Sequence, residues 1–214
     1  MSQRGRPKCF DREKALDAAL LLFWEQGFEQ TSVDEAAAAM GIGTSSLYSS
    51  FGGKEALFLA AIRQYLAGRG SVYNKAVTEG KTAREAFSKL LEVSAIELTR
   101  PDQPRGCLLW LALPTCSPKY EKFQEQMNQL RDETEEVWLQ RLREAVESKE
   151  LPQSTDIHLL ASYFRTTLAG MSLQSRSGAT RNQLIQIAKL AMGIWPAPYF
   201  HGDDTGSNPV GDAN

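Results

Sequence analysis

The most informative pattern of apolar and polar positions lies in residues 31–58. Its first half places apolar side chains at the spacing of one helical face: Val33, Ala36, Ala37 and Met40. Gly41 follows, and glycine closes a helix because it adopts the left-handed conformation without steric cost. A second short helix is predicted over 44–51, with Leu47 pointing inward. The pattern therefore predicts two short helices joined by a tight turn, which is the helix-turn-helix arrangement.

The outer face of the second predicted helix carries hydroxyl groups and no charge. Its members are Thr44, Ser45, Ser46, Tyr48, Ser49 and Ser50. A helix that faces only solvent usually carries Lys or Glu, whereas hydroxyls and a phenol can approach phosphates and base edges closely. This face favours DNA binding, and an ordinary capped surface loop is the alternative.

Two flanking segments extend this unit. Residues 11–27 read as a helix with an apolar stripe that ends at Gly27, so the chain predicts a three-helix head over residues 10–53. Lys54 begins a fourth helix, where a positive charge opposes the helix dipole unless an anion such as phosphate binds there. A solvated surface lysine is the alternative.

Residues 1–9 form a basic arm with no acidic residue. Its charges are Arg4, Arg6 and Lys8, and Gly5 and Pro7 keep the segment extended. Such an arm can lie in a narrow minor groove, where arginine meets an enhanced negative potential. Taken alone, such a segment favours a disordered terminus; beside a helix-turn-helix, it is predicted to bind DNA.

The strings at 10–28 and 39–57 resemble the signature of TetR-family transcriptional repressors. They read FDREKALDAALLLFWEQGF and AMGIGTSSLYSSFGGKEAL. The resemblance is close over residues 4–60 and limited to length and helix pattern beyond. It implies phosphate contacts from Tyr48 and Lys54, and the full set of expected DNA contacts is Arg4, Arg6, Lys8, Thr31, Thr44, Ser45, Ser46, Tyr48, Ser49 and Lys54. The family usually has Ser or Thr at the position of Gly43 and often a basic residue at Thr44, so Thr44 or Ser45 is expected to cap the second helix instead.

The rest of the chain predicts only helices. They cover 82–99, 106–113, 118–149, 155–175 and 180–195, and Pro, Gly, Asp and Asn dominate a tail over 196–214 that is expected to be disordered. The predicted fold class is therefore all-α, with about nine helices. It comprises the head and a larger ligand-binding and dimerisation body over 54–195.

The last two predicted helices carry more apolar surface than one core needs. One stripe on the final helix is Leu184, Ile187, Ala188, Ala191, Ile194 and Trp195. The helix before it is apolar on two faces, one of which contains Leu159, Tyr163, Gly170 and Leu173. Since both faces must be buried, a second copy of the chain is the expected partner. TetR-like proteins usually dimerise through these two helices, and a two-sided core helix in a monomer is the alternative.

Large side chains in the body are candidates for an effector pocket that would take an apolar or aromatic ligand. They are Phe87, Trp110, Phe123, Met127, Trp138, Tyr163, Phe164 and Met171, and the small Cys107 is a further pocket candidate. Ordinary core packing is the alternative for each, and the existence of a pocket is implied by the family resemblance. Cys107 follows Arg105 at the start of a short helix, which could lower its pKa and make it a redox or electrophile sensor; a buried, inert thiol is the alternative.

Composition bears on how the protein would bind DNA, on its cellular compartment and on cofactors. The net charge of −2 is not that of a bulk nucleic-acid binder, so DNA binding must rest on local charge. Three cysteines are too few for a disulfide framework, and no leader or membrane-length apolar run is visible, so a cytoplasmic protein is expected. No metal-ligand spacing or phosphate loop occurs, and no cofactor is expected.

Two function classes compete with a ligand-responsive repressor that binds a palindromic operator as a homodimer. The first is a helical enzyme with Cys107 as nucleophile and His158 as base, which no spacing requires. The second is a helical adaptor that uses the head to bind protein.

Overall fold

The computed structural model describes residues 11–111 and 117–196, so the basic arm, Cys9, Cys116 and nearly all of the predicted tail lie outside it. Ten α-helices and two short 3₁₀ helices occur in the described ranges, and no strand does. The α-helices are α1 (Arg12–Gln26), α2 (Val33–Ala39), α3 (Thr44–Phe51), α4 (Lys54–Ala67), α5 (Ser71–Thr78), α6 (Ala83–Glu97), α7 (Leu108–Leu111), α8 (Glu121–Glu147), α9 (Ile157–Arg176) and α10 (Arg181–Ala191). The predicted all-α fold is confirmed.

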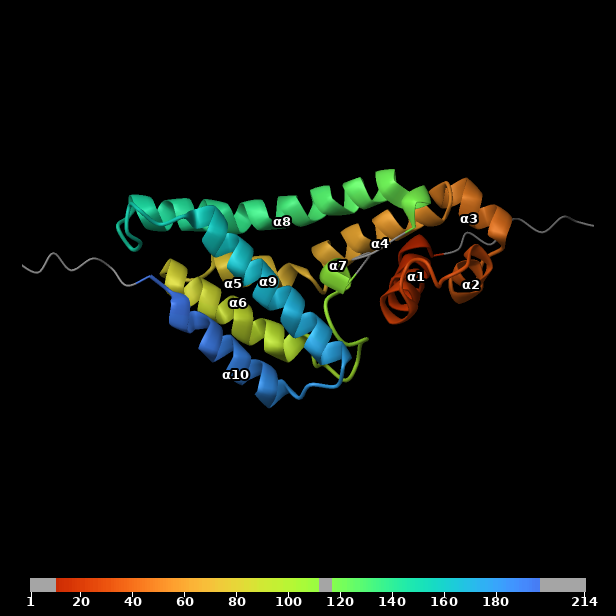
Figure 1. Cartoon of the computed structure of the whole chain (residues 1–214). Helices are drawn as coiled ribbons and strands as arrows, with labels where there is room; N and C mark the ends of the chain where they lie inside the picture. Colours follow the sequence, from red (N-terminus) through yellow and green to blue (C-terminus); the bar gives the residue numbers. More distant parts are fainter. Residues whose placement is uncertain (1–10, 112–116, 197–214) are drawn as a thin grey trace, which may run out of the picture.

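The head, formed by α1 to α3, lies at one end of the molecule, and α4 leads from it into the body (Figure 1). The long helix α8 runs along one side and reaches the head with its first turn (Figure 1). On the other side of the body, α10 packs on α6, and α9 packs against α8, α6 and α10. Helix α9 therefore contacts helices on both sides of the body.

An aromatic cluster joins the head to the body. Phe28 lies 4.5 Å from Phe123 and 5.0 Å from Tyr120 between ring centroids, and Phe58 of α4 lies 5.7 Å from Phe123. Such pairs prefer tilted and edge-to-face packing over stacked faces, as seen here. Phe123 therefore belongs to this junction at the start of α8, and its prediction as a pocket residue is wrong.

Two helices differ from the sequence-based prediction. Helix α5 was not predicted, because only Tyr73, Ala76 and Val77 of its eight residues are buried and a glycine-rich stretch precedes it. It is held by packing against α6 and α8. Helix α7 covers only Leu108–Leu111 of the predicted 106–113, and the described residues stop there.

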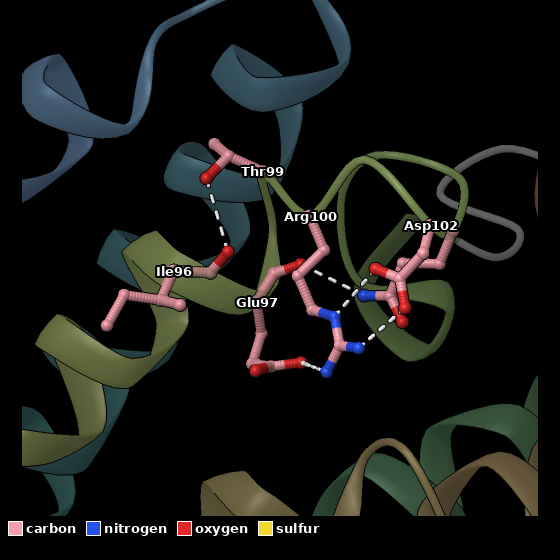
Figure 2. A network of polar contacts seen from close by, with 6 residues as sticks. Ile96, Glu97, Thr99, Arg100 and Asp102 are labelled. Carbon is pink, nitrogen blue, oxygen red and sulfur yellow. Dashed lines mark hydrogen bonds and ion pairs between the residues drawn. The ribbon is translucent and has the colours of Figure 1, made fainter.

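The loop after α6 is closed by a compact polar network. Arg100 donates to both carboxylate oxygens of Asp102, at 2.9 and 2.6 Å, and to Glu97 at 3.3 Å (Figure 2). The Arg100 guanidinium lowers the pKa of Asp102 to about 2. The Gly106 amide then returns to the carbonyl of Leu98 at 3.1 Å. This closed loop places the turn at 105–107 against the C-terminal end of α9.

Candidate nucleic-acid interface

The turn between α2 and α3 is built as the sequence predicts. Ser32 caps α2: its hydroxyl accepts from the Glu35 amide, and the Glu35 carboxylate accepts from the Ser32 amide at 2.7 Å. The Ser32 amide also lowers the pKa of Glu35. Gly41 has φ +68°, the left-handed conformation that ends the helix. These contacts fix the angle at which α3 leaves α2.

The start of α3 corrects one expectation. Gly43 is the N-cap and Thr44 is the first helical residue, and no side chain caps the helix. The Thr44 hydroxyl instead donates to the Asp34 carboxylate at 2.9 Å, which ties α3 to the first turn of α2. The expected cap by Thr44 or Ser45 is therefore wrong. Because no side chain caps α3, the backbone amides of its first turn remain available to an anion.

The outer face of α3 is exposed, as predicted. Leu47 is fully buried against the head, whereas Tyr48 is 53% exposed and Ser45, Ser46, Ser49 and Ser50 are also exposed. A Cβ on Gly53 would lie 3.6 Å from the Tyr48 ring, so the glycine turn passes close beneath the phenol. The face thus presents hydroxyl groups to solvent on a short helix whose opposite side is packed through the buried Leu47.

Thr31 does not belong to this face. Its side chain is completely buried, and its hydroxyl donates to the Gly27 carbonyl at 2.8 Å. The prediction that Thr31 contacts DNA is wrong, because the residue links the end of α1 to the start of α2. Its position next to the Ser32 cap gave no signal of burial in the sequence.

Lys54 lies at the base of the head rather than extended into solvent. Its ammonium sits 4.4 Å from the centre of the Phe28 ring and donates to the Glu29 carbonyl at 3.4 Å. Partial burial lowers its pKa. The charge is therefore held beside the first turn of α4, near the glycine turn under Tyr48.

The described part of the head is not electropositive. Residues 11–53 contain two basic residues against seven acidic ones. Both cations are already engaged, Arg12 over the Phe51 ring at 4.7 Å and Lys14 with Asp11 at 3.4 Å. Arg4, Arg6 and Lys8 lie outside the described residues, so the structure does not test their predicted role.

Comparison with known proteins decides the family. Residues 15–61 match the model of the bacterial regulatory proteins of the tetR family. The Escherichia coli (strain K12) HTH-type transcriptional repressor ComR is 32% identical over 90% of this chain and 92% of its own. This chain belongs to the TetR family.

Solved TetR-family structures extend the match to a DNA complex. A cysteine mutant of the regulator CifR, complexed with a 26-base-pair double-strand operator DNA, superposes with a TM-score of 0.85. It is 34% identical over 89% of this chain and all of its own. A second CifR cysteine mutant with operator DNA matches at 33% identity and the same TM-score, over 90% of this chain and all of its own. The protein is a DNA-binding transcriptional regulator and not an enzyme.

Most predicted pocket residues form packed core in this TetR-family body. Phe87 lies 4.6 Å from Phe164 and 6.3 Å from Trp138 between ring centroids, and Trp110 is 6.3 Å from Trp138. Met127 and Met171 are buried, while Tyr163 is half-buried. One polar atom in this core is unpaired, since the Trp138 indole nitrogen finds no acceptor among the described residues.

Cys107 has the environment of an inert thiol. It is 1% exposed, its sulfur accepts from the Tyr65 hydroxyl at 3.2 Å, and burial raises its pKa. The neighbouring Arg105 points elsewhere, to the Ser175 hydroxyl and the Ala179 carbonyl. Of the two interpretations of Cys107, the buried, inert thiol is therefore confirmed, and a lowered pKa is excluded. His158 is exposed, so the hypothetical catalytic pair also lacks a shared site.

The predicted dimer stripe on α10 divides between two faces. Leu184, Ala188 and Ala191 are buried within the chain, where α10 packs on α6. Trp195 packs 5.7 Å from Phe87 and 6.0 Å from Phe164, also inward. The predictions of a partner contact at Leu184, Ala188 and Ala191 are wrong, because their side chains already fill the core of one copy. Trp195 is only partly buried, so its contact with a partner stays a prediction. Ile187 and Ile194 remain on the outside.

Within residues 11–111 and 117–196, no helix is long and apolar enough to span a membrane. The same residues contain no group of three or more His, Cys, Asp or Glu side chains placed to hold a metal ion.

Proposed function

We propose that the protein binds a palindromic operator as a homodimer in the cytoplasm, represses transcription there, and is released by a small apolar or aromatic effector. The two copies of α3 would enter successive major grooves, with half-sites about one helical turn, roughly 34–36 Å, apart. The observation that carries the proposal is the exposed, uncharged hydroxyl face of α3, backed by a buried Leu47.

Within each head we assign two kinds of contact. Ser45, Ser46 and Ser49 would approach base edges, whereas Tyr48 and the N-terminal turn of α4 with Lys54 would hold phosphates. Because the described head is rich in acidic groups, the arm residues Arg4, Arg6 and Lys8 would supply much of the attraction to DNA.

Selection of bound DNA from a random pool tests this assignment, and a palindromic consensus is expected. Ser46→Ala should change the selected bases. Lys54→Ala should weaken all sequences alike and reduce the salt slope of binding by about 1. If neither substitution alters binding to any selected palindrome, the assignment of the head fails.

The homodimer rests on an apolar surface that runs along α9 and α10. Its most exposed members are Leu190 at 79%, Leu159 at 69%, Leu173 at 60% and Ile194 at 48%. Two shallow grooves on this surface meet at Tyr163. Contiguous exposed apolar side chains of this kind mark protein interfaces. Leu190→Asp should convert the dimer to monomer in sedimentation velocity. Lys189→Gln serves as the control, because it changes the net charge by the same amount at an exposed position on a different side of α10.

The effector would bind beside Trp138, which carries the unpaired buried donor found among the described residues. Because Trp138 lies in packed core, the side chains around it would have to move apart to admit a ligand. A ligand with a hydrogen-bond acceptor beside an aromatic or aliphatic part would satisfy that indole N–H. Small aromatic acids, ketones and aliphatic acids should be screened for release of operator DNA. Trp138→Phe should weaken those ligands that bear an acceptor more than purely apolar ones, and equal losses for both would contradict this site.

A further inference from the structure

The C-terminal end of α1 lacks a positive charge of its own, although a helix terminus favours one there. No basic residue occurs in its last turn. The last four carbonyls of any α-helix have no partner inside the helix, and in α1 the Gly27 amide satisfies only that of Phe23, at 2.8 Å. The carbonyls of Trp24 and Glu25 must therefore find donors elsewhere.

Arg176, the last residue of α9, supplies them. One guanidinium nitrogen donates to the carbonyls of Trp24 and Glu25, both at 2.7 Å. The other donates to the carbonyl of Arg105 at 3.2 Å. A guanidinium at this terminus also opposes the negative end of the α1 dipole. A residue about 150 positions away thus completes the first helix of the head.

The turn at 105–107, whose Arg105 carbonyl accepts from Arg176, also contacts both α1 and α9. The Trp24 indole donates to the Gly106 carbonyl at 3.1 Å, and the Cys107 amide donates to the Ser172 hydroxyl of α9 at 3.1 Å. A Cβ on Gly106 would lie 2.3 Å from the Leu111 side chain and 3.1 Å from the Ser172 carbonyl, so a larger residue would force the Leu111 side chain to shift and would crowd the α9 backbone. The end of α1, the turn at 105–107 and the end of α9 form one junction, here called the α1–α9 junction.

We infer that Arg176 is a positioning residue, which sets the placement of the DNA-reading head relative to the dimer surface. The inference rests on the proposed function, because Leu173 of the proposed dimer surface lies only three residues before Arg176 on the same helix. Helix α9 therefore connects the partner copy directly to the head. A change at Arg176 removes no proposed DNA contact, but it loosens the link that fixes the distance between the two heads.

The experiment measures affinity for a set of duplexes in which the spacing of the selected half-sites is lengthened or shortened by one base pair. One base pair changes the half-site separation by about 3.4 Å. The wild type is expected to prefer one spacing strongly. Arg176→Gln should reduce that preference at least about fivefold, the lower range of typical coupling between sites. The selected half-site bases, the salt slope and the sedimentation of the dimer should stay unchanged.

Two further variants keep the result interpretable. Arg176→Lys retains the charge but loses the planar fork, so its spacing preference should fall between those of the wild type and Arg176→Gln. If Arg176→Gln does not fold, the spacing preference of Arg176→Lys tests the positioning role. Arg143→Gln is the matched control, because Arg143 is paired with Glu136 on its own helix α8 and should leave the spacing preference intact.

The possible outcomes separate two failures. An equal loss of affinity at every spacing, or an unchanged preference in both Arg176 variants, would overturn the positioning role alone. A wild-type protein that binds no paired half-sites would overturn the proposed operator and this inference with it.

Discussion

Thr31→Val tests whether the Thr31 hydroxyl serves the fold or the DNA. Valine has nearly the volume of threonine, so the substitution removes one hydroxyl without opening a cavity. That hydroxyl is buried and donates to the Gly27 carbonyl at 2.8 Å. The net loss of such a bond is about 1 kcal/mol, and more if the carbonyl is left without any partner. For a chain of this length, about 1 kcal/mol corresponds to a fall in Tm of about 2–4 °C.

The assay pairs thermal unfolding with operator binding at 25 °C. Because the head should remain folded well below Tm, the Kd for DNA is expected to change by less than about twofold. A hydroxyl that contacts a phosphate would behave differently, since a hydrogen bond to a charged group is worth about 1.5–3 kcal/mol, or about tenfold or more in Kd.

Ser46→Ala is the matched comparison, because it removes an exposed hydroxyl from α3 and should leave Tm unchanged. A Thr31→Val protein with the wild-type Tm and a Kd weakened tenfold would refute the structural role of Thr31.

Further predictions concern the turn, the cysteine and the end of α7. Gly41→Ala meets no neighbouring atom but forces alanine to φ +68°, so unfolding should become easier by about 1–2 kcal/mol in urea titrations; an unchanged midpoint would show that the turn relaxes. Since burial raises the pKa of Cys107, its thiolate fraction at pH 8 should be lower than that of a free thiol. Iodoacetamide followed by mass spectrometry should find Cys107 unmodified in the native protein and modified in urea, and rapid native labelling would revive the sensor hypothesis. Gly106→Ala should destabilise the protein more than Gly41→Ala, because it adds a close contact with Leu111 to the same backbone strain.

Local signals were strong enough to predict the head. The helix-turn-helix depends on contacts between near neighbours, such as the Ser32–Glu35 cap and the left-handed Gly41, which residue type and spacing specify directly. The boundaries of α1 and α4 follow for the same reason, since Gly27 and Gly53 flank them. Apolar periodicity likewise indicated the long helices of the body, because each has a continuous buried stripe.

Tertiary packing decided which side of each stripe faces inward and where single polar groups lie. Leu184 and Ala188 belong to the same sequence pattern as Ile187, yet those two are buried and Ile187 is exposed, because α6 covers the other edge of α10. The burial of Thr31 and Cys107 and the bond from Arg176 to α1 also depend on residues distant in the chain. A sequence pattern records the period of a helix but not its partners, so these contacts became visible only in three dimensions.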